Sequence, residues 1–396
     1  MESEKMVAQG RELNVARQQN LKRVLRLLIN EAPISRAEIA RQTGMSRSTV
    51  SSVFSALDRQ GYVAHLGPGE STEAGGRRPD LYAFNGRYGY IASFNLTSAH
   101  LYMMLAYANG EKIVYDRLTL ENRNVLSIMS SMENFLRQSK EFDDTKHGLL
   151  GIGISIHAIV DQNQVVDSPF IAMNGINLQE YFCAQYQVPV IVQNEANLSA
   201  VFERDYDTDE QEVANLAVMS IHRGLGVGII ANHQLVTGFK GRAGETGRLK
   251  FRNENGDWAQ ISDFCAEDYL VKAVADAIGL PGQQIDYEEI ARLFERKDPR
   301  VMPLIPFFAS MVGTVVYNVL MAYGPEIIYL NSNLLELLPA MTDAIAVEAK
   351  KLGVDVPLKV MRHSSYVPMY GATSLVIRQA LDLKTGELAF QWQTNL

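Results

Sequence analysis

The chain has 396 residues, of which 47% are hydrophobic and 21% are charged, as in a soluble globular protein, and its length suggests two or three domains. Its first residues lack the apolar stretch of a signal peptide, and we find no apolar run near the roughly 20 residues that a membrane-spanning helix requires. Two distant cysteines, Cys183 and Cys265, exclude a disulfide framework, and we interpret both as thiols. We therefore expect a cytoplasmic protein that has no membrane partner.

Charge is distributed unevenly along the chain. The net charge of −8 argues against DNA binding by the chain taken as one unit. Residues 1–85, however, hold 12 Lys and Arg against 9 Asp and Glu, a balance of +3, so that −11 falls on the rest of the chain. A basic head on an acidic body is typical of a small nucleic-acid-binding module fused to a domain that does not touch DNA.

The basic head is predicted to begin with two helices. The first has an apolar face with helical spacing, and Pro33 follows it. That face is formed by Leu21, Val24, Leu25 and Leu28. Ser35 and Glu38 have the spacing of a capping box, in which each side chain bonds the other's free backbone N–H, so the second helix begins near Arg36. Gly44 is suited to end that helix, because glycine readily adopts the positive φ of a helix C-terminus.

A third helix follows, capped by Ser46, with an inner face of Val50, Phe54 and Leu57. Two short helices joined by a glycine turn are typical of a helix-turn-helix. The outer face of the third helix carries small hydroxyl side chains and one arginine, which fit a major groove and bond phosphates or base edges. These outer residues are Arg47, Ser48, Thr49, Ser51, Ser52 and Ser55.

Residues 61–66 and 81–84 are predicted to form the two strands of a wing around a glycine-rich loop. Within the loop, Arg77 and Arg78 follow two glycines and can reach phosphates or a narrow minor groove, and the alternative is a solvated turn. The chain is thus expected to begin with a winged helix-turn-helix. The candidate DNA-contacting residues are Arg36, Arg47, Ser48, Thr49, Ser51, Ser52, Arg77 and Arg78.

From Tyr90 onward, apolar runs alternate with helical patterns. The runs are YIASFNL, LYMMLAY, GLLGIGISI, VPVIVQN, LAVMSIH and VGIIAN, with a helix around 125–136 and long helices after Asp263 and Pro303. Such alternation indicates an α/β fold, and two strand-rich halves suggest two lobes around a cleft, where ligands of these folds bind. The apolar helix after Pro303 can form core or interface, and we favour core. A solvated loop is expected for the acidic residues Asp205, Asp207, Asp209, Glu210 and Glu212.

Four segments resemble the ROK family (repressors, open reading frames and kinases), most closely its branch of xylose and N-acetylglucosamine repressors. They are Gly148–Ile154 at the strand before the first sugar loop, Val192–Asn197 at the sugar and catalytic segment, Arg223–Ile230 at the second phosphate loop, and Gly241–Gly247 at the Gly-Glu-x-Gly-His segment. The resemblance implies a winged helix-turn-helix over residues 1–85 and a two-lobed sugar-kinase-like domain of the actin/hexokinase type over residues 86–396. Lobe 1 would span about 86–193 plus the C-terminal helix, and lobe 2 about 194–368.

Departures from the family imply that kinase chemistry is lost. Family kinases open with an Asp-x-Gly-x-Thr phosphate loop, and the aligned residues 93–97 are Ser-Phe-Asn-Leu-Thr. Their catalytic aspartate is Glu195 here, which is one methylene longer and would displace a base that must lie within about 3 Å of the attacked hydroxyl. The family's zinc ligands fall on Arg248, Trp258, Gln260 and Cys265, a set with one sulfur. We therefore expect no zinc, no bound ATP and no enzyme activity.

The resemblance also implies a sugar site. Its candidate residues are Asn194, Glu195, Glu245, Arg248, Glu267 and His157. Carboxylates accept hydrogen bonds from vicinal hydroxyls, and an amide both donates and accepts. His157 stands in the family's Pro-Gly sugar loop, either as a substitute hydrogen-bonding partner or as a plain loop histidine, and Arg248 either holds its loop by a salt bridge or faces the ligand. A vestigial site without a ligand is the alternative.

The sequence therefore predicts a repressor of carbohydrate-metabolism genes that binds operator DNA as a homodimer or homotetramer, with a sugar or sugar derivative controlling its operator affinity. Two alternatives stay open. One is a regulator whose effector is a partner protein, the sugar site being vestigial. The other is an active sugar kinase with a DNA-binding appendage.

Overall fold

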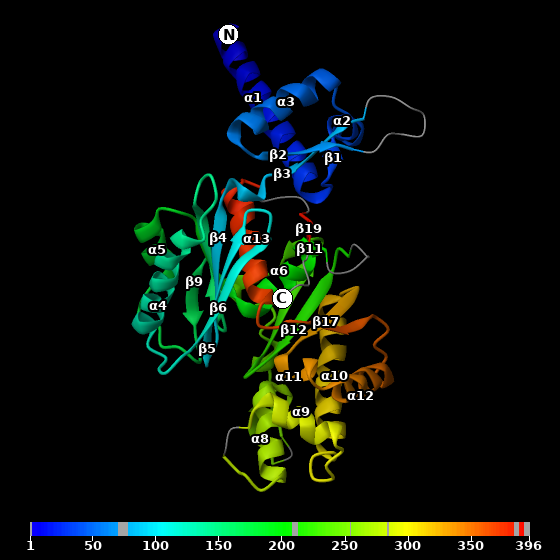
Figure 1. The fold of residues 1–396 in the computed structure, drawn as a ribbon. Helices are drawn as coiled ribbons and strands as arrows, with labels where there is room; N and C mark the ends of the chain where they lie inside the picture. The colour runs from blue at the N-terminus through cyan, green and yellow to red at the C-terminus, as the bar shows by residue number, and fades with distance from the viewer. Residues whose placement is uncertain are drawn as a thin grey trace.

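The structure is a computed structural model of the whole chain, and it describes residues 2–69, 78–207, 213–253, 255–282, 285–383 and 388–391. Side chains are described from residue 15 onward in these ranges, except those of residues 207 and 391. A small head of helices and short strands lies above two larger lobes, each built on its own sheet (Figure 1).

The head is a winged helix-turn-helix. Its sheet has the order β1-β3-β2, and β2 and β3 form the antiparallel wing. Its elements are α1 (Glu2–Asn30), β1 (Ile34–Ser35), α2 (Arg36–Thr43), α3 (Arg47–Gln60), β2 (Val63–Pro68) and β3 (Asp80–Phe84). The three helices and the two strands that the sequence predicts for this region are confirmed.

Local chemistry sets the helix boundaries of the head. Ser35 Oγ accepts a hydrogen bond from the Glu38 backbone N–H at 3.2 Å, and Ser46 Oγ accepts one from the backbone N–H three residues on at 3.1 Å. Gly44 ends α2 in the left-handed conformation. The reciprocal half of the predicted capping box does not form, because the Glu38 carboxylate bonds the Arg41 guanidinium instead.

The first lobe is built on a five-stranded sheet of order β10-β7-β4-β5-β6, in which β7 runs parallel to both of its neighbours. Its elements are η1 (Gly86–Tyr88), β4 (Tyr90–Leu96), β5 (His100–Tyr107), β6 (Lys112–Thr119), α4 (Val125–Gln138), η2 (Ser139–Glu141), β7 (Leu149–Ile156), β8 (Ile159–Asp161), β9 (Gln164–Asp167), α5 (Leu178–Tyr186) and β10 (Val190–Asn194). Helices α4 and α5 cover one face of the sheet, and α13 (Val367–Ala380) covers the other (Figure 1).

The second lobe is built on a sheet of order β14-β13-β12-β17-β18. Its elements are α6 (Glu195–Asp205), β11 (Tyr206–Asp207), β12 (Leu216–Ile221), β13 (Leu225–Ala231), β14 (Gln234–Leu235), η3 (Phe239–Gly241), η4 (Thr246–Arg248), β15 (Lys250–Arg252), β16 (Trp258–Gln260), α7 (Ser262–Cys265), α8 (Glu267–Ala277), α9 (Tyr287–Glu295), α10 (Leu304–Tyr323), β17 (Ile327–Asn331), α11 (Asn333–Glu336), α12 (Pro339–Lys351) and β18 (Leu358–Val360). The predicted α/β class with two strand-rich lobes is confirmed.

Helix α10 corrects one expectation from the sequence. Its 20 residues carry no charged side chain, and it is the one helix in the described part of the chain that is long and apolar enough to cross a membrane. The expectation that no run approaches this length is therefore wrong. In the fold α10 packs against α12 and buries Val312, Val316 and Val319 in the second lobe, which agrees with its interpretation as a core helix.

Helix α6 is held between the second-lobe sheet and α13 by close backbone packing. A Cβ atom on Gly228 of β13 would lie 2.0 Å from the carbonyl oxygen of Ala196, and one on Gly371 of α13 would lie 1.9 Å from that of Leu198. No side chain fits at either position without moving the helix. The close approach of α6 therefore accounts for Gly228, a residue of the segment that resembles a phosphate loop.

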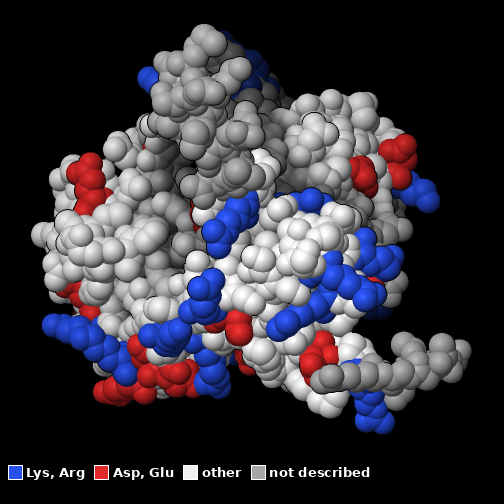
Figure 2. Space-filling model, turned by 90° about the horizontal axis from the view of Figure 1, so that it is seen from above, with Lys and Arg blue, Asp and Glu red and all other residues white. Residues whose placement is uncertain are grey.

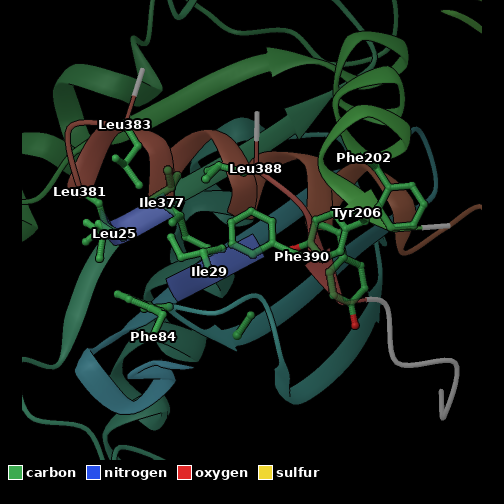
Figure 3. Packing of buried hydrophobic residues seen from close by; sticks show 14 of the residues in the cluster. Leu25, Ile29, Phe84, Phe202, Tyr206, Ile377, Leu381, Leu383, Leu388 and Phe390 are labelled. Atoms are coloured by element: carbon green, nitrogen blue, oxygen red, sulfur yellow. The ribbon is translucent and has the colours of Figure 1, made fainter. Parts of the chain in front are cut away.

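One continuous apolar cluster joins the head to the lobes. Leu25 and Ile29 of α1 lie beside the chain's C-terminal residues (Figure 3). Those residues, 381–383 and 388–391, are called the C-terminal strap here, and the apolar side chains that it contributes to the cluster are Leu381, Leu383, Leu388 and Phe390. Its strand β19 (Phe390–Gln391) pairs in parallel with β11, directly after α6. The backbone N–H of Ala389 also donates to Asn30 Oδ1 at 3.0 Å, so the strap touches both the head and the end of α6.

Asp205, at the C-terminal end of α6, is not the solvated residue that its acidic neighbours predict. It is 1% exposed and forms ion pairs with Arg204 at 2.7 Å and Arg378 of α13 at 2.6 Å. Burial alone would raise its pKa, but the two guanidinium groups hold the pKa below its usual range. The side chain of Asp207 and residues 209, 210 and 212 of the acidic run lie outside the described part of the chain.

Candidate functional site

One face of α3 carries the predicted DNA-contacting side chains. The exposed set is Arg47, Ser48, Ser51, Ser52 and Ser55, and Thr49 is half-buried. The Ser46 hydroxyl is hydrogen-bonded to the hydroxyls of Ser48 at 2.8 Å and Thr49 at 2.9 Å, which gathers polar groups at a helix N-terminus that favours phosphate. Seen from the end that carries the head, Lys and Arg predominate near the middle of the face, and Asp and Glu lie mostly nearer its rim (Figure 2). Contact with DNA stays a prediction for these residues.

The other predicted arginines differ in where they lie. Arg36 packs on the head's core, with its guanidinium 4.1 Å from the ring centre of Phe54 and 5.1 Å from that of Tyr82. Contact of Arg36 with DNA stays a prediction. Arg78 is exposed in the wing loop, two residues before β3 begins. Arg77 lies outside the described residues.

A pocket of about 460 Å³ opens between the two lobes. It is lined by the start of α6, the β12–β13 connection, the turn after β7 and residues between 245 and 262. Five of the six predicted effector residues line it: His157, Asn194, Glu195, Glu245 and Arg248. Glu267 does not, and His222, which the sequence prediction omits, does.

Asn194 lines the pocket, but its amide is largely committed to the fold. Its Oδ1 accepts from the backbone N–H of Asn197 at 3.2 Å and so caps α6, and its Nδ2 donates to the carbonyl oxygen of Ala158 at 2.8 Å. The amide therefore fixes the start of α6 against the turn that follows β7. One Nδ2 hydrogen and one Oδ1 lone pair are what remain for a ligand.

Glu195 begins α6 and is 3% exposed. Its Oε1 accepts hydrogen bonds from Ser199 at 2.9 Å, Ser220 at 3.1 Å and Asn331 Nδ2 at 2.9 Å. Burial alone would raise its pKa, yet the neighbouring His222 lowers the pKa to about 2. The carboxylate is therefore ionised at neutral pH and accepts hydrogen bonds without donating any.

His222 lies between two carboxylates at the end of β12. Its Nε2 is 3.7 Å from Glu195 Oε1, and its Nδ1 is 3.7 Å from Glu267 Oε2. Burial alone would lower its pKa, but the two carboxylates raise the pKa to about 10. His222 stands directly after a buried strand and before Arg223-Gly224, and strand ends that face a cleft are where such folds bind ligands. That position is the sequence signal that could have indicated it.

Glu267 lies behind His222 and is absent from the pocket lining, and its predicted contact with an effector stays a prediction. Its Oε1 accepts from the Ser332 hydroxyl at 2.6 Å and from the Leu334 backbone N–H at 3.0 Å, and its Oε2 accepts from the Tyr287 hydroxyl at 2.7 Å. Every one of these groups belongs to the second lobe. The carboxylate therefore orients His222 and has little capacity left for a ligand.

His157 faces the pocket from the turn after β7, with its ring centre 5.4 Å from that of His222. Burial lowers its pKa to about 4, so the imidazole is neutral at pH 7 and has one donor and one acceptor nitrogen. Its place in the pocket favours the substitute hydrogen-bonding partner over the plain loop histidine. Contact with an effector stays a prediction.

Arg248 both forms a salt bridge and lines the pocket. Its guanidinium contacts Glu245 Oε2 at 2.9 Å and also pairs with Asp167 at the end of β9 in the first lobe. Burial raises the pKa of Glu245, and Arg248 opposes that shift. This pair of contacts links the two lobes beside the pocket, at the position that matches one of the family's zinc ligands.

The other positions that match the family's zinc ligands and first phosphate loop make contacts of different kinds. Trp258 is 62% exposed with Arg252 stacked over its ring, and Cys265 is buried among apolar residues. No group of three potential ligands gathers anywhere in the described ranges. In the loop region, Asn95 Oδ1 accepts from Ser155 at 2.9 Å, and Thr97 Oγ1 closes its own turn by accepting from the His100 backbone N–H at 2.9 Å.

Comparison with known proteins decides the family. Residues 98–379 match the ROK family, and residues 17–64 match a winged helix-turn-helix DNA-binding family. The chain belongs to the ROK family. The xylose repressor of Lactiplantibacillus pentosus is 31% identical over 377 residues, which cover 95% of this ROK chain and 96% of the relative. The xylose repressor of Staphylococcus xylosus is 30% identical, with 92% of this chain and 96% of the relative covered.

A solved structure of a ROK family transcriptional regulator, a homolog of the Escherichia coli Mlc protein, matches with a TM-score of 0.75 at 18% identity, covering 93% of this ROK chain and 98% of that chain. The match includes the head and both lobes, so the architecture is that of a ROK regulator throughout. This chain is a ROK transcriptional regulator similar to xylose repressors, with DNA binding assigned to its winged head.

Proposed function

We propose that this ROK regulator is a cytoplasmic repressor of carbohydrate-metabolism genes and that a neutral sugar bound in the pocket controls its operator affinity. The pocket carries the proposal, because it presents an ionised acceptor, Glu195, beside the neutral imidazole of His157. Such a set binds the vicinal hydroxyls of a sugar. The names of the relatives make D-xylose the first effector to test.

Helix α6 supports a physical connection between the two sites. Glu195 at its first residue lines the pocket, and Tyr206, directly after its last residue, lies in the cluster with Phe390 of the strap. The strap contacts α1 of the head (Figure 3). Because α6 is packed at backbone distance on both sides, a displacement at its start is transmitted to the strap rather than absorbed locally.

We further infer that the regulator transfers no phosphoryl group and acts as a symmetric dimer. Residues 93–97 offer no carboxylate for a metal-bound phosphate, and the Asn95 amide is already bonded to Ser155 and to the carbonyl oxygen of Ser365. Two winged helices related by a twofold axis would meet paired half-sites about one DNA turn apart. A coupled assay that detects ATP-dependent phosphorylation of any pentose or hexose would contradict the first inference, and a monomeric mass in light scattering would contradict the second.

Calorimetric titration of the full chain tests the effector. The panel contains D-xylose, D-glucose, N-acetylglucosamine and their phosphates, and we expect D-xylose to saturate one site per chain. Glu195→Gln should weaken binding roughly tenfold or more, since a hydrogen bond to a charged acceptor contributes about 1.5–3 kcal/mol. Glu180→Gln, an exposed carboxylate of α5, is the matched control and should bind as the parent does. If none of these sugars binds, the result would favour a partner protein as the effector.

A further inference from the structure

The charges at the base of the pocket form a buried row of carboxylate, imidazole and carboxylate. The His222 ring lies 3.7 Å from Glu195 Oε1 on one side and 3.7 Å from Glu267 Oε2 on the other. The three side chains are 13%, 4% and 3% exposed, respectively. Two buried carboxylates repel each other unless a cation lies between them, and the His222 ring occupies the place of that cation.

The far end of this row is fixed. Glu267 is held by three donors of the second lobe, from α9, α11 and the residue before α11, as described above. Its position therefore fixes Nδ1 of His222, and the planar ring then directs Nε2 at Glu195. Because Glu267 and its donors lie outside the pocket lining, this half of the row serves orientation rather than ligand contact.

At the near end of the row, the donors of Glu195 gather on one of its two carboxylate oxygens. The hydrogen bonds that Glu195 accepts from Ser199, Ser220 and Asn331 all end on Oε1. Nε2 of His222 approaches the same oxygen. Within the described part of the chain no side chain donates to Oε2, so this is the oxygen that can accept from a ligand.

We propose that His222 is a positioning residue of the effector site, which keeps Glu195 ionised and its Oε2 directed at the effector hydroxyls. The proposal rests on the proposed sugar-binding function and adds a residue to it. The groups that face His222 are Glu195 from α6, Glu267 from α8 and His157 from the turn after β7, with Tyr287 of α9 bound to Glu267. An ionised Glu195 accepts and does not donate, so the effector supplies the hydroxyl hydrogen at this point.

The charge state of His222 tests the proposal without any ligand. In the sugar-free full chain labelled with ¹⁵N-histidine, the two ring nitrogens of His222 should both be protonated at pH 8, and Glu267→Gln should shift its titration to lower pH. His222→Gln identifies the resonance. A neutral His222 ring at pH 7 in the sugar-free protein overturns the proposal, whatever the effector is.

Binding as a function of pH gives the second readout, which a purely structural role would not change. The Kd of the parent for D-xylose should stay within about twofold between pH 6 and 8.5, because both Glu195 and His222 keep their charges. In His222→Gln, Glu195 loses its counter-charge and the pKa of Glu195 rises. The Kd for D-xylose should therefore increase roughly tenfold from pH 8.5 to pH 6. His100→Gln, a histidine outside the pocket, is the control. A flat profile for His222→Gln overturns the proposal.

The two experiments separate this inference from the proposed function. Absence of sugar binding by the parent protein at every pH would contradict the proposed effector, while the NMR titration would still decide the charge of His222. Sugar binding by the parent with a neutral His222 would contradict the inference and leave the proposed function standing.

Discussion

At the scale of single residues, the charged groups of this ROK regulator depend on partners that are distant in the sequence. His157, Glu195, Glu245 and Arg248 could be assigned to the pocket because each stands in a recognisable family segment. The strand end before His222 could have indicated its place in the pocket, but its charge could not be predicted, since that depends on Glu267, which the fold brings behind it. The buried ion pair of Asp205 could not be predicted from the sequence either. An acidic run predicts solvated side chains and does not indicate a partner such as Arg378, which lies 173 residues further on.

The raised pKa of His222 makes a prediction about stability and pH. Its pKa of about 10 in the fold lies above the ordinary value of 6.5, so protonation favours the folded state. That stabilisation is complete below about pH 6.5 and is lost as the pH rises through 10. The Tm advantage of the parent over His222→Gln should therefore shrink between pH 7 and pH 10 in thermal denaturation. An advantage that stays constant over this window would contradict the assignment.

At the scale of elements, the parts that the sequence predicts well are those fixed by neighbouring residues. The caps at Ser35 and Ser46 and the turn at Gly44 are local, and the α2 and α3 boundaries follow from them. The glycines of the segment that resembles a phosphate loop were harder to interpret, because phosphate binding and helix packing both call for a residue without Cβ. Only the fold shows that Gly228 accommodates α6.

The recognition face of α3 makes a prediction about DNA. Arg47→Ala should lower operator affinity roughly tenfold, since a specific arginine contact is worth about 1–3 kcal/mol, and it should leave sugar binding unchanged. Arg59→Ala, at the opposite end of the same helix, is the matched control and should bind with the parent's affinity. Fluorescence anisotropy with a labelled operator measures both. Equal losses for the two variants would mean that α3 is not oriented with its N-terminus toward DNA.

At the scale of the whole molecule, the C-terminal strap connects the head with the lobes, beside the direct contact of Tyr62 with Tyr88. The strap pairs with the strand after α6 and bonds Asn30 of α1, 359 residues away in the sequence. Separations of this size leave no local pattern, so the sequence indicates a head and a body without indicating their connection. The boundary near residue 85 stays a prediction.

Weakening the strap should separate sugar binding from DNA control. Phe390 is 1% exposed between the head and α6, and Phe390→Ala should leave the Kd for D-xylose within about twofold, since the pocket is untouched. The sugar-dependent change in operator affinity should fall at least threefold, because α6 loses its contact with the head. Phe142→Ala, an exposed residue, is the control. Full sugar control in Phe390→Ala would show that the signal travels by another connection.

The most direct test of the central claim is operator affinity with and without sugar. Duplexes that the full chain selects from a random-sequence pool should contain paired half-sites, and binding to them is then titrated at about 150 mM salt, because phosphate contacts make affinity depend strongly on salt. We predict that saturating D-xylose changes the operator Kd at least tenfold, with no change for a duplex of scrambled sequence. An operator Kd that is the same with and without every sugar of the panel would contradict the account.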